Sequence, residues 1–435
     1  MKHLFDSRRL AIVALAAILG SCQWLGGAAA QSTGNHRAKA VETVPGMPAV
    51  ADPENLYSEI GPTHLSPAVA GDLYRIYVPN RISGDVTVID PMLMKVVARF
   101  RVGVNPQHIV PSYDLRTLWV VNNAENRSTG SVVPINPRTG KPGHPIAVDD
   151  PYNMYFTPDG QSAIVVAEES QRLDFRDPHT MELQWSLPTP GCAGINHADF
   201  SIDGRYALFT CEYGGGLAKV DMVHRQVVGY LTLNKDGVTK QSQASLLVPA
   251  SATAAATDPS LTDPATGFPI CAGTGMPQDI RVSPDGKVFY VADMLADGVY
   301  LVDGDSFSQI GFIPTGRGAH GLYPSRDGTK LYVANRGSHK VEGGRHGPGS
   351  VSVIDFSTRA VIANWPIPGG GSPDMGNVTA DGHYLGLSGR FDNVVYRFDT
   401  TAGAVVQIPV DREPHGLTVW PQPGRYSLGH TGNLR

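Results

Sequence analysis

Four histidines stand at equivalent points of the sequence, each just before a short apolar run. They are His108, His197, His320 and His415. A neutral imidazole is the commonest protein ligand for transition-metal ions, so this recurrence could hold a divalent metal ion. The alternative is a polar channel lining that bonds to water. The other equivalent positions are Asn153, Gln278 and Asp374.

A second set of polar residues follows a later apolar run in each segment. Its carboxylates, amides and guanidinium groups could bind a small molecule if the fold brings them together. The set contains Asn122, Asn123, Glu168, Glu169, Cys211, Glu212, Asp293, Asn335, Arg336 and Arg390.

Three cysteines, Cys192, Cys211 and Cys271, could form another constellation. In an oxidising compartment they predict one disulfide and one buried thiol, and a Cys/His metal site is the less favoured alternative. No Cys-x-x-Cys-His motif is present, so covalent attachment of c-type haem is not predicted.

Motifs for familiar catalytic machinery are missing from the sequence. It contains no Gly-x-Ser-x-Gly elbow, no His-Glu-x-x-His and no phosphate-binding glycine loop. Enzyme activity therefore has no support from motifs.

A repeated unit positions these residues. Its best copies place Asp285-Gly286 before the run Phe289 to Asp293, and Asp327-Gly328 before Leu331 to Asn335. Asp-Gly between alternating apolar runs favours a hairpin turn, and β-branched and aromatic neighbours favour strands. Weaker copies turn near Asp114, Asp159, Asp203 and Asp381.

Each unit therefore predicts a four-stranded antiparallel blade, and seven first strands can be counted. Blades bury their faces against one another, so the array must close into a ring. The N-terminal copy, which begins near Leu73, lacks a good first strand, whereas His415 to Val419 begins a strand that has no following blade. We expect these two ends to share the closing blade, which leaves no free sheet edge. Whether Tyr426 to His430 adds a strand is left open.

Tyr77 to Asp90, Val282 to Asp303 and Gly328 to Asp355 resemble the repeats of the YVTN family of β-propellers, which includes YncE-like and surface-antigen-like periplasmic proteins. The resemblance covers roughly residues 70 to 435. It implies a seven-bladed propeller but does not select a function, since such propellers include binding modules, a lactonase branch and relatives of the haem-binding propeller of nitrite reductase.

The resemblance also implies that the first strands line a central channel, and that both polar sets gather at one mouth. His108 and His415 would then lie on adjacent blades, which makes them the predicted metal pair. His197 and His320 would be set apart by blades without histidine. Two insertions would extend on the side of this mouth, residues 238–274 and Ser338 to Gly349. They would form either lids over a ligand or ordinary surface loops.

The N-terminus predicts export. Basic residues precede the apolar run Leu10 to Leu19, which is too short to span a bilayer, so residues 1–30 are expected to form a signal peptide. Cleavage is expected either at a lipobox that ends at Cys22, a lipidation candidate, or before Gln31. Residues 31–67 are polar and aperiodic, which predicts a flexible tether, and residues 68–435 form the propeller.

The net charge of the chain limits the classes of partner that we expect. Removal of residues 1–30 takes away three basic residues and one acidic residue, so the net charge moves from −5 to −7. No basic stripe is present, so nucleic acid is not an expected partner. We expect a monomeric, extracytoplasmic binding or scaffolding module that holds a small molecule or protein at its mouth, with membrane contact only through a lipid anchor. The alternative is a metal- or cofactor-dependent oxidoreductase or a lactonase-like hydrolase at the same mouth.

Overall fold

The computed structural model describes residues 40–124, 129–235, 262–264, 266–344 and 347–435. All described residues belong to one compact unit, Lys39–Arg435. The expected signal peptide, the Cys22 lipobox and most of the 238–274 insertion lie outside the described residues. No helix within the described ranges has the length and apolar character needed to cross a membrane.

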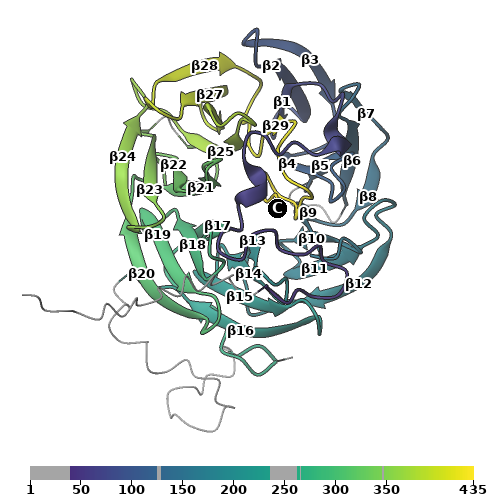
Figure 1. The fold of residues 1–435 in the computed structure, drawn as a ribbon, viewed down its shortest axis with the longest axis vertical. Coiled ribbons are helices and arrows are strands. Elements are labelled where there is room, and N and C mark those ends of the chain that lie inside the picture. Colours follow the sequence, from purple (N-terminus) through teal and green to yellow (C-terminus); the bar gives the residue numbers. More distant parts are fainter. Residues whose placement is uncertain (1–39, 125–128, 236–261, 265, 345–346) are drawn as a thin grey trace, which may run out of the picture. The chain divides into compact units, whose positions relative to one another are not determined.

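This unit is a ring of seven antiparallel sheets around a central channel (Figure 1). This confirms the predicted all-β, seven-bladed propeller. Blade 1 consists of β29 (Thr418–Trp420), β1 (Arg75–Asn80), β2 (Asp85–Asp90) and β3 (Lys95–Arg101). Blade 2 consists of β4 (Pro106–Pro111), β5 (Leu118–Asn122), β6 (Gly130–Asn136), β7 (Lys141–Pro142) and β8 (Ile146–Val148), of which the last two both pair with β6. Blade 3 consists of β9 (Pro151–Phe156), β10 (Ala163–Ala167), β11 (Arg172–Arg176) and β12 (Leu183–Pro188).

The remaining four blades repeat this order, with the innermost strand first. Blade 4 consists of β13 (Ile195–Phe200), β14 (Tyr206–Cys211), β15 (Gly216–Asp221) and β16 (Gln226–Thr232). Blade 5 consists of β17 (Pro277–Val282), β18 (Val288–Asp293), β19 (Gly298–Asp303) and β20 (Ser308–Pro314). Blade 6 consists of β21 (Ala319–Pro324), β22 (Lys330–Asn335), β23 (Ser350–Asp355) and β24 (Ala360–Pro366). Blade 7 consists of β25 (Pro373–Val378), β26 (Tyr384–Gly389), β27 (Val394–Asp399) and β28 (Val405–Pro409).

Closure of the ring takes place in blade 1. Strand β29 pairs antiparallel with β1, and Ile76 faces Val419 in the register. Gly416, just before β29, exchanges backbone hydrogen bonds with β4 of blade 2. The predicted blade shared by the two ends of the propeller is therefore confirmed.

The Asp-Gly turns explain why each first strand reverses into a second. In blade 5 Ser283 donates to the Asp285 carboxylate at 2.5 Å, and the Ser283 Oγ accepts from the Val288 N–H at 2.9 Å. Gly286 adopts φ +71°, a conformation that side chains with a Cβ rarely take. The Ser325 turn repeats the pattern, because Ser325 donates to Asp327 and accepts from the Lys330 N–H.

Apolar side chains from neighbouring sheets pack between the blades. Tyr290 and Ala292 of β18 belong to the same buried cluster as Leu322 of β21 and Val333 of β22. Because each sheet is covered on both faces, all six residues of β18 are buried.

Residues 44–69 lie against the ends of the Asp-Gly turns and include two short 3₁₀ helices, η1 (Ser58–Ile60) and η2 (Pro67–Val69). The Leu56 N–H donates to the carbonyl of Pro284 at 2.7 Å, and the hydroxyl of Tyr57 donates to the carbonyl of Val282. The tether predicted up to residue 67 is therefore wrong for this stretch. Its few apolar residues show no periodicity, and only their long-range packing makes them part of the fold.

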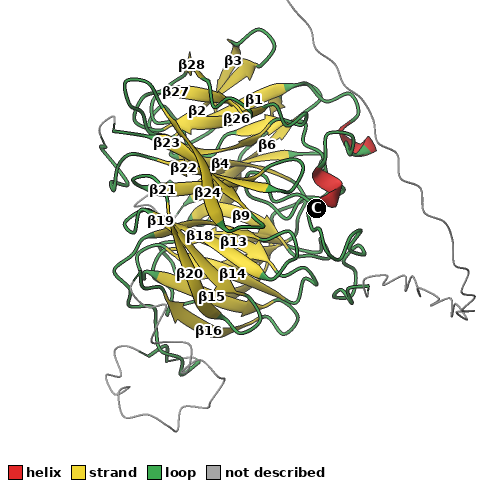
Figure 2. Ribbon diagram, turned by 60° about the vertical axis from the view of Figure 1, so that its left-hand side comes forward, coloured by secondary structure: helices red, strands yellow, loops and turns green. Residues whose placement is uncertain are grey.

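Residues 426–435 form a hairpin inside the channel, called here the C-terminal hairpin. Leu428 N–H donates to Asn433 at 2.7 Å, and Arg435 N–H donates to Tyr426 at 3.0 Å. The hairpin also bonds to β9, since the His430 N–H donates to Met154 at 2.9 Å. Figure 2 shows the C-terminal end on the same side of the ring as the two short helices. Tyr426 to His430 thus enters the channel and adds no strand to a blade.

Candidate functional site

Equivalent residues of the innermost strands fall into two layers along the channel. In each blade the last residue of the second strand pairs with one residue near the start of the innermost strand. In each innermost strand, the residue that directly follows this paired residue in the sequence belongs to the mouth layer. The residue after that belongs to the deep layer. A register shift at this point lets two successive side chains face the channel. The mouth layer contains Gln107, Tyr152, Asn196, Gln278, His320, Asp374 and His415. The deep layer contains His108, Asn153, His197, Asp279, Gly321, Met375 and Gly416.

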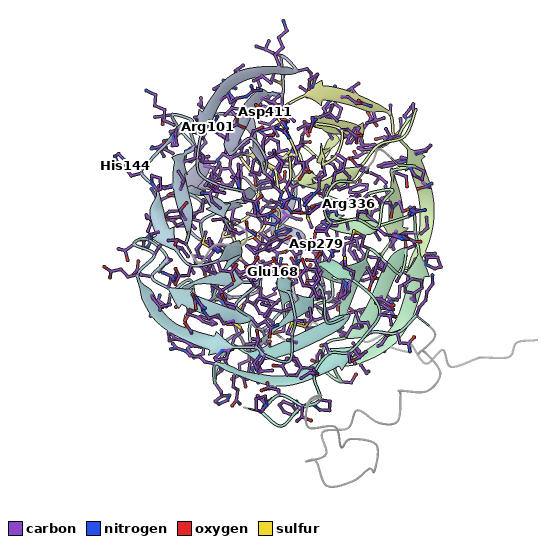
Figure 3. The ribbon with its side chains drawn as sticks, turned by 180° about the vertical axis from the view of Figure 1, so that it is seen from behind. Arg101, His144, Glu168, Asp279, Arg336 and Asp411 are labelled. Carbon is purple, nitrogen blue, oxygen red and sulfur yellow. A yellow bond between two sulfur atoms is a disulfide. The ribbon has the colours of Figure 1, made fainter. Side chains whose placement is uncertain are left out.

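A narrow hollow opens at the mouth layer. Figure 3 shows Glu168 and Arg336 near the centre of the ring, together with Asp279, while His144 lies at the outer rim. The hollow is lined by Arg81, Gln107, Asn123, Tyr152, Glu168, Glu212, Tyr213, Gln278, His320, Arg336, Val341 and Arg390. Of the predicted site residues, the mouth thus gathers seven from six blades: Asn123, Glu168, Glu212, Gln278, His320, Arg336 and Arg390.

Charge is distributed unevenly around this mouth. The residue directly after the second strand occupies the same place in every blade, and in order from blade 1 to blade 7 these residues are Arg81, Asn123, Glu168, Glu212, Met294, Arg336 and Arg390. Arginines fill blades 6, 7 and 1, while glutamates fill blades 3 and 4. All seven side chains are buried. The mouth therefore has a basic arc and an acidic arc.

Asp374 anchors the basic arc from the mouth layer. Its carboxylate accepts from Arg336 at 2.6 Å, and it lies 2.9 Å from His320 Nδ1 and 2.7 Å from His415 Nδ1. Burial alone would raise the pKa of Asp374, but Arg336 and then the two imidazoles hold that pKa well below its usual value. Arg390 shares this carboxylate at the longer distance of 3.7 Å. Asp374 is therefore ionised. Four side chains surround its single negative charge: Arg336, His320, His415 and Arg390.

Several predicted residues serve the scaffold instead. Asp293 accepts hydrogen bonds from the N–H groups of Leu295 and Ala296, which fixes its own turn. Asn335 donates to Ser350 and Ser352 between strands. Asn122 likewise bonds to neighbouring strands, through the Val102 carbonyl and Ser131. These side chains follow the pattern of the repeat but face the blade rather than the mouth.

The cysteines divide as predicted. Cys192 and Cys211 form a disulfide, and Cys271 is a buried free thiol. The Cys271 sulfur lies 3.6 Å from that of Cys211, and burial raises the pKa of Cys271 to about 12. The thiol is therefore protonated, and the Cys/His metal alternative has no geometric support among these three residues.

The deep layer brings together three histidines, of which His430 was missed from the sequence. The ring nitrogens of His108, His197 and His430 that could bind a metal lie within 4.8 Å of one another. His108 and His197 have ring centroids 5.4 Å apart, so the expectation that a blade without histidine keeps them apart is wrong. The predicted partner, His415, also lies near His108, with ring centroids 4.8 Å apart, but its Nδ1 contacts Asp374.

Other missed residues have recognisable signals in hindsight. Arg81 follows Asn80 as Arg336 follows Asn335, so the repeat itself places it in the basic arc. Tyr152 and Gln107 each precede a residue that was identified, because the sequence does not reveal the register shift that exposes both neighbours to the channel. His430 has no repeat signal, since the C-terminal hairpin belongs to no blade.

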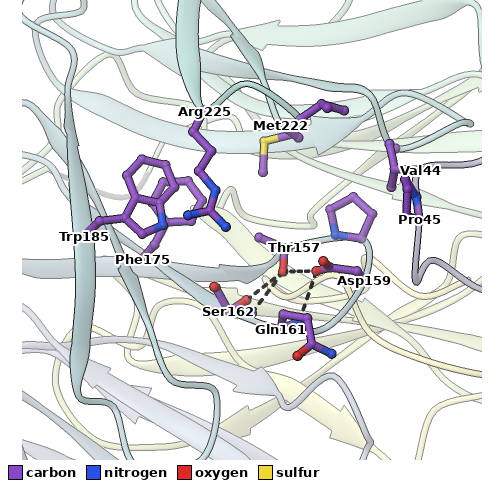
Figure 4. Close-up of a pocket in the computed structure, with 13 residues that line it drawn as sticks. Val44, Pro45, Thr157, Asp159, Gln161, Ser162, Phe175, Trp185, Met222 and Arg225 are labelled. Atoms are coloured by element: carbon purple, nitrogen blue, oxygen red, sulfur yellow. Dashed lines mark hydrogen bonds between the residues drawn. The ribbon is translucent and has the colours of Figure 1, made fainter.

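A separate pocket lies at the Asp-Gly turn end, between blades 3 and 4 (Figure 4). Val44 and Pro45 border it, and the Arg225 guanidinium lies 5.0 Å from the centre of the Trp185 ring. None of the predicted site residues lines this pocket, so it adds nothing to the chemistry of the channel.

These features define a seven-bladed β-propeller with a polar channel that opens at one mouth. Residues 270–423 match the family model described as YNCE-like beta-propeller, which confirms the resemblance identified from the sequence. No curated protein matches the chain.

Solved structures share the fold at low sequence identity. Hydrazine synthase of Kuenenia stuttgartiensis is 18% identical with a TM-score of 0.53, and the match covers 79% of this chain and 97% of the other. Dihydro-heme d1 dehydrogenase NirN is 15% identical with a TM-score of 0.52, covering 80% and 75%. A putative 6-phosphogluconolactonase from Bacteroides uniformis is 17% identical with a TM-score of 0.56, covering 79% and 98%. At these identities the likeness concerns the fold alone.

Proposed function

We propose that this YNCE-like propeller is an exported binding module whose mouth holds a small zwitterion, a molecule with both an acidic group and an amine. The observation that carries the proposal is the division of equivalent mouth positions into a basic arc and an acidic arc. Opposed buried charges on a rigid scaffold orient a ligand that carries the complementary pair.

Arg390 is the centre of the subsite that would bind the acidic group of the ligand. It is buried, its Nε has no hydrogen-bond partner among the described residues, and its nearest carboxylate oxygen, on Asp374, lies 3.7 Å away. Burial, followed by the charges of Arg81 and Arg336, lowers the pKa of Arg390 to about 10. A ligand carboxylate would supply the missing acceptor and relieve the repulsion among the arginines.

The acidic arc supplies the subsite that would bind the amine of the ligand. Glu212 accepts from Asn196 Nδ2, which fixes the orientation of its carboxylate. Burial, followed by the charges of Glu212 and Glu168, raises the pKa of Tyr152 well above its usual value, and the charge of Arg390 lowers it in part. Tyr152 lines the hollow together with these three side chains. A short ligand that spans Tyr152 would place its amine beside the glutamates and its acid beside Arg390.

Calorimetric titration with amino acids and dipeptides tests the proposal. Unblocked ligands should bind more tightly than their N-acetyl and C-amide forms, by roughly tenfold or more for each lost charged hydrogen bond. Arg390→Gln should remove the preference for a free carboxylate, and Glu212→Gln the preference for a free amine. Glu169→Gln, at an exposed neighbour of the arc, is the matched control.

Equal binding of blocked and unblocked ligands would overturn the proposal, as would an equal loss in Glu169→Gln. Export and lipidation at Cys22 remain proposals that rest on the N-terminal sequence alone. The oxidoreductase or lactonase-like alternative uses the same mouth and stays a prediction.

A further inference from the structure

Three buried histidines from three separate parts of the chain converge beneath the mouth. His108 comes from β4, His197 from β13 and His430 from the tip of the C-terminal hairpin. All three are fully buried. Their convergence depends on the hairpin, because the blades alone contribute only two of the rings.

The spacing of the rings suits a common ion. Ring centroids are 5.4 Å apart for His108 and His197, 5.1 Å for His108 and His430, and 4.6 Å for His197 and His430. Metal–nitrogen bonds of about 2.0–2.1 Å in a tetrahedral arrangement place imidazole centroids roughly 5 Å apart. Small rotations of the rings would therefore aim one nitrogen of each at a shared centre.

The nitrogens of the cluster lack the partners that burial normally demands. Neither ring nitrogen of His108, nor Nε2 of His197, has a hydrogen-bond partner among the described residues. A buried polar atom left in this state costs about 1–3 kcal/mol. A metal ion that accepts the lone pair of one His108 ring nitrogen would remove this cost for that atom.

Asn153 shows where positive charge is already favoured. Its side-chain Nδ2 lies 3.0 Å from His197 Nδ1 and 2.9 Å from His430 Nδ1. The amide oxygen accepts from the Met154 N–H, so the amide donates with its nitrogen to both rings. Two lone pairs thus point at one electropositive group between the imidazoles.

We propose that His108, His197 and His430 form a binding site for a late first-row divalent transition-metal ion, such as zinc or copper. Three neutral nitrogen ligands match the preference of these ions, and three protein ligands leave a coordination position open. Tyr152 lies over the cluster, with its ring centroid 5.4 Å from that of His108 and 5.9 Å from that of His197.

Charge and protonation around the site agree with this assignment. Burial, followed by the charges of His430 and His197, holds the pKa of His108 well below its usual value. Burial likewise lowers the pKa of His197 and His430. The three rings are therefore neutral near pH 7, which is the form that binds metal. His430 Nε2 lies 3.6 Å from the Asp279 carboxylate, the kind of partner that orients metal-binding histidines.

The test uses the full chain, stripped with a chelator and then titrated with zinc or copper salts. Calorimetry and elemental analysis should give one ion per chain. His430→Gln and His197→Gln should each weaken binding more than the roughly 10–100-fold expected for loss of an orienting partner. His144→Gln, at an exposed histidine, is the matched control. His415→Gln separates this site from the His108 and His415 pair, since it should keep the ion.

Three results would overturn the proposal: no ion on the stripped wild-type chain, undiminished binding by the His430 and His197 variants, or loss of binding in His415→Gln. Circular dichroism checks that each variant folds. Should the histidine variants unfold, the copper spectrum of the wild type decides, because an electron paramagnetic resonance signal without coupling to imidazole nitrogens rules the site out. Zwitterion binding without metal is measured separately, so the two proposals fail independently.

Discussion

The two ends of the channel are built from different materials. At the mouth, equivalent positions of all seven blades supply charged and polar side chains around a hollow. At the turn end, residues 44–69 and the C-terminal hairpin cover the strands, and Arg435 donates to the buried Asp199 carboxylate at 2.6 Å. The repeats thus form the open end, and segments outside the repeats form the covered end.

This difference separates two kinds of sequence information. Residues at equivalent positions of the repeat differ in chemical type from blade to blade, while their backbone positions stay the same. Substitutions at the mouth can therefore change which ligand binds without changing the fold. The covering segments contribute buried contacts that no blade could make alone. Ligand specificity should therefore depend on the mouth, and the covering segments should affect stability first.

Deletion of residues 413–435 should have the largest effect. It removes β29 and the C-terminal hairpin, including the fully buried Trp420, and leaves β1 as an unpaired edge. Open edges promote aggregation, so the truncated chain should aggregate or melt at a markedly lower temperature. Thermal unfolding followed by calorimetry and light scattering checks this. Addition of the missing peptide in trans should restore part of the stability, and an unchanged transition would contradict the shared blade.

Asp374→Asn should come next, with a loss of about 3–5 kcal/mol in the free energy of unfolding. The substitution removes the carboxylate that compensates Arg336 and contacts His320 and His415, and broken buried ion pairs cost this much. Urea titration measures the loss.

Asp199→Asn is the comparison from the covered end, because it breaks the contact with Arg435. Both variants should lose stability, but only Asp374→Asn should also weaken zwitterion binding. Equal effects of the two variants on ligand binding would contradict the division of roles between the ends.

The smallest effect, taken per residue, should be a loss of metal-free stability as pH falls below the ordinary histidine pKa of about 6.5. His108 has a folded-state pKa lowered by burial, by His430, His197 and His320, and raised in part by Asp374. Between the folded and unfolded pKa values the unfolded chain binds protons that the folded chain does not, so stability decreases with decreasing pH.

Each such histidine contributes a slope of up to about 1.4 kcal/mol per pH unit. Urea titrations between about pH 5 and 7.5 with a chelator present measure the total slope, and His430→Gln should make it shallower. A free energy of unfolding that stays constant over this interval would contradict the neutral, buried state of the cluster.

The repeat made most of the fold predictable. Asp285-Gly286 and its equivalents determine where strands reverse, and His415 to Val419 indicates closure because a first strand appears without its blade. The N-terminal covering segment and the C-terminal hairpin were not predictable, since Tyr57 and His430 acquire their roles through contacts with residues far away in the sequence. The mouth was predicted in part, because the pattern gives the blade but not the register shift that turns two successive side chains into the channel, one at the mouth and one below it.

The pairing of β1 with β29 makes blade 1 kinetically unlike the others. Six blades are hairpins of neighbouring residues, whose contacts form early and locally. Blade 1 joins Tyr77 to Thr418, so it cannot be completed until the rest of the ring has brought these strands together. The entropic cost of closing a loop grows only with the logarithm of its length. Because the blades between β1 and β29 have already folded, the entropic cost of this last step stays small. We therefore expect blade 1 to be the last blade completed, when β29 pairs with β1 and closes the ring.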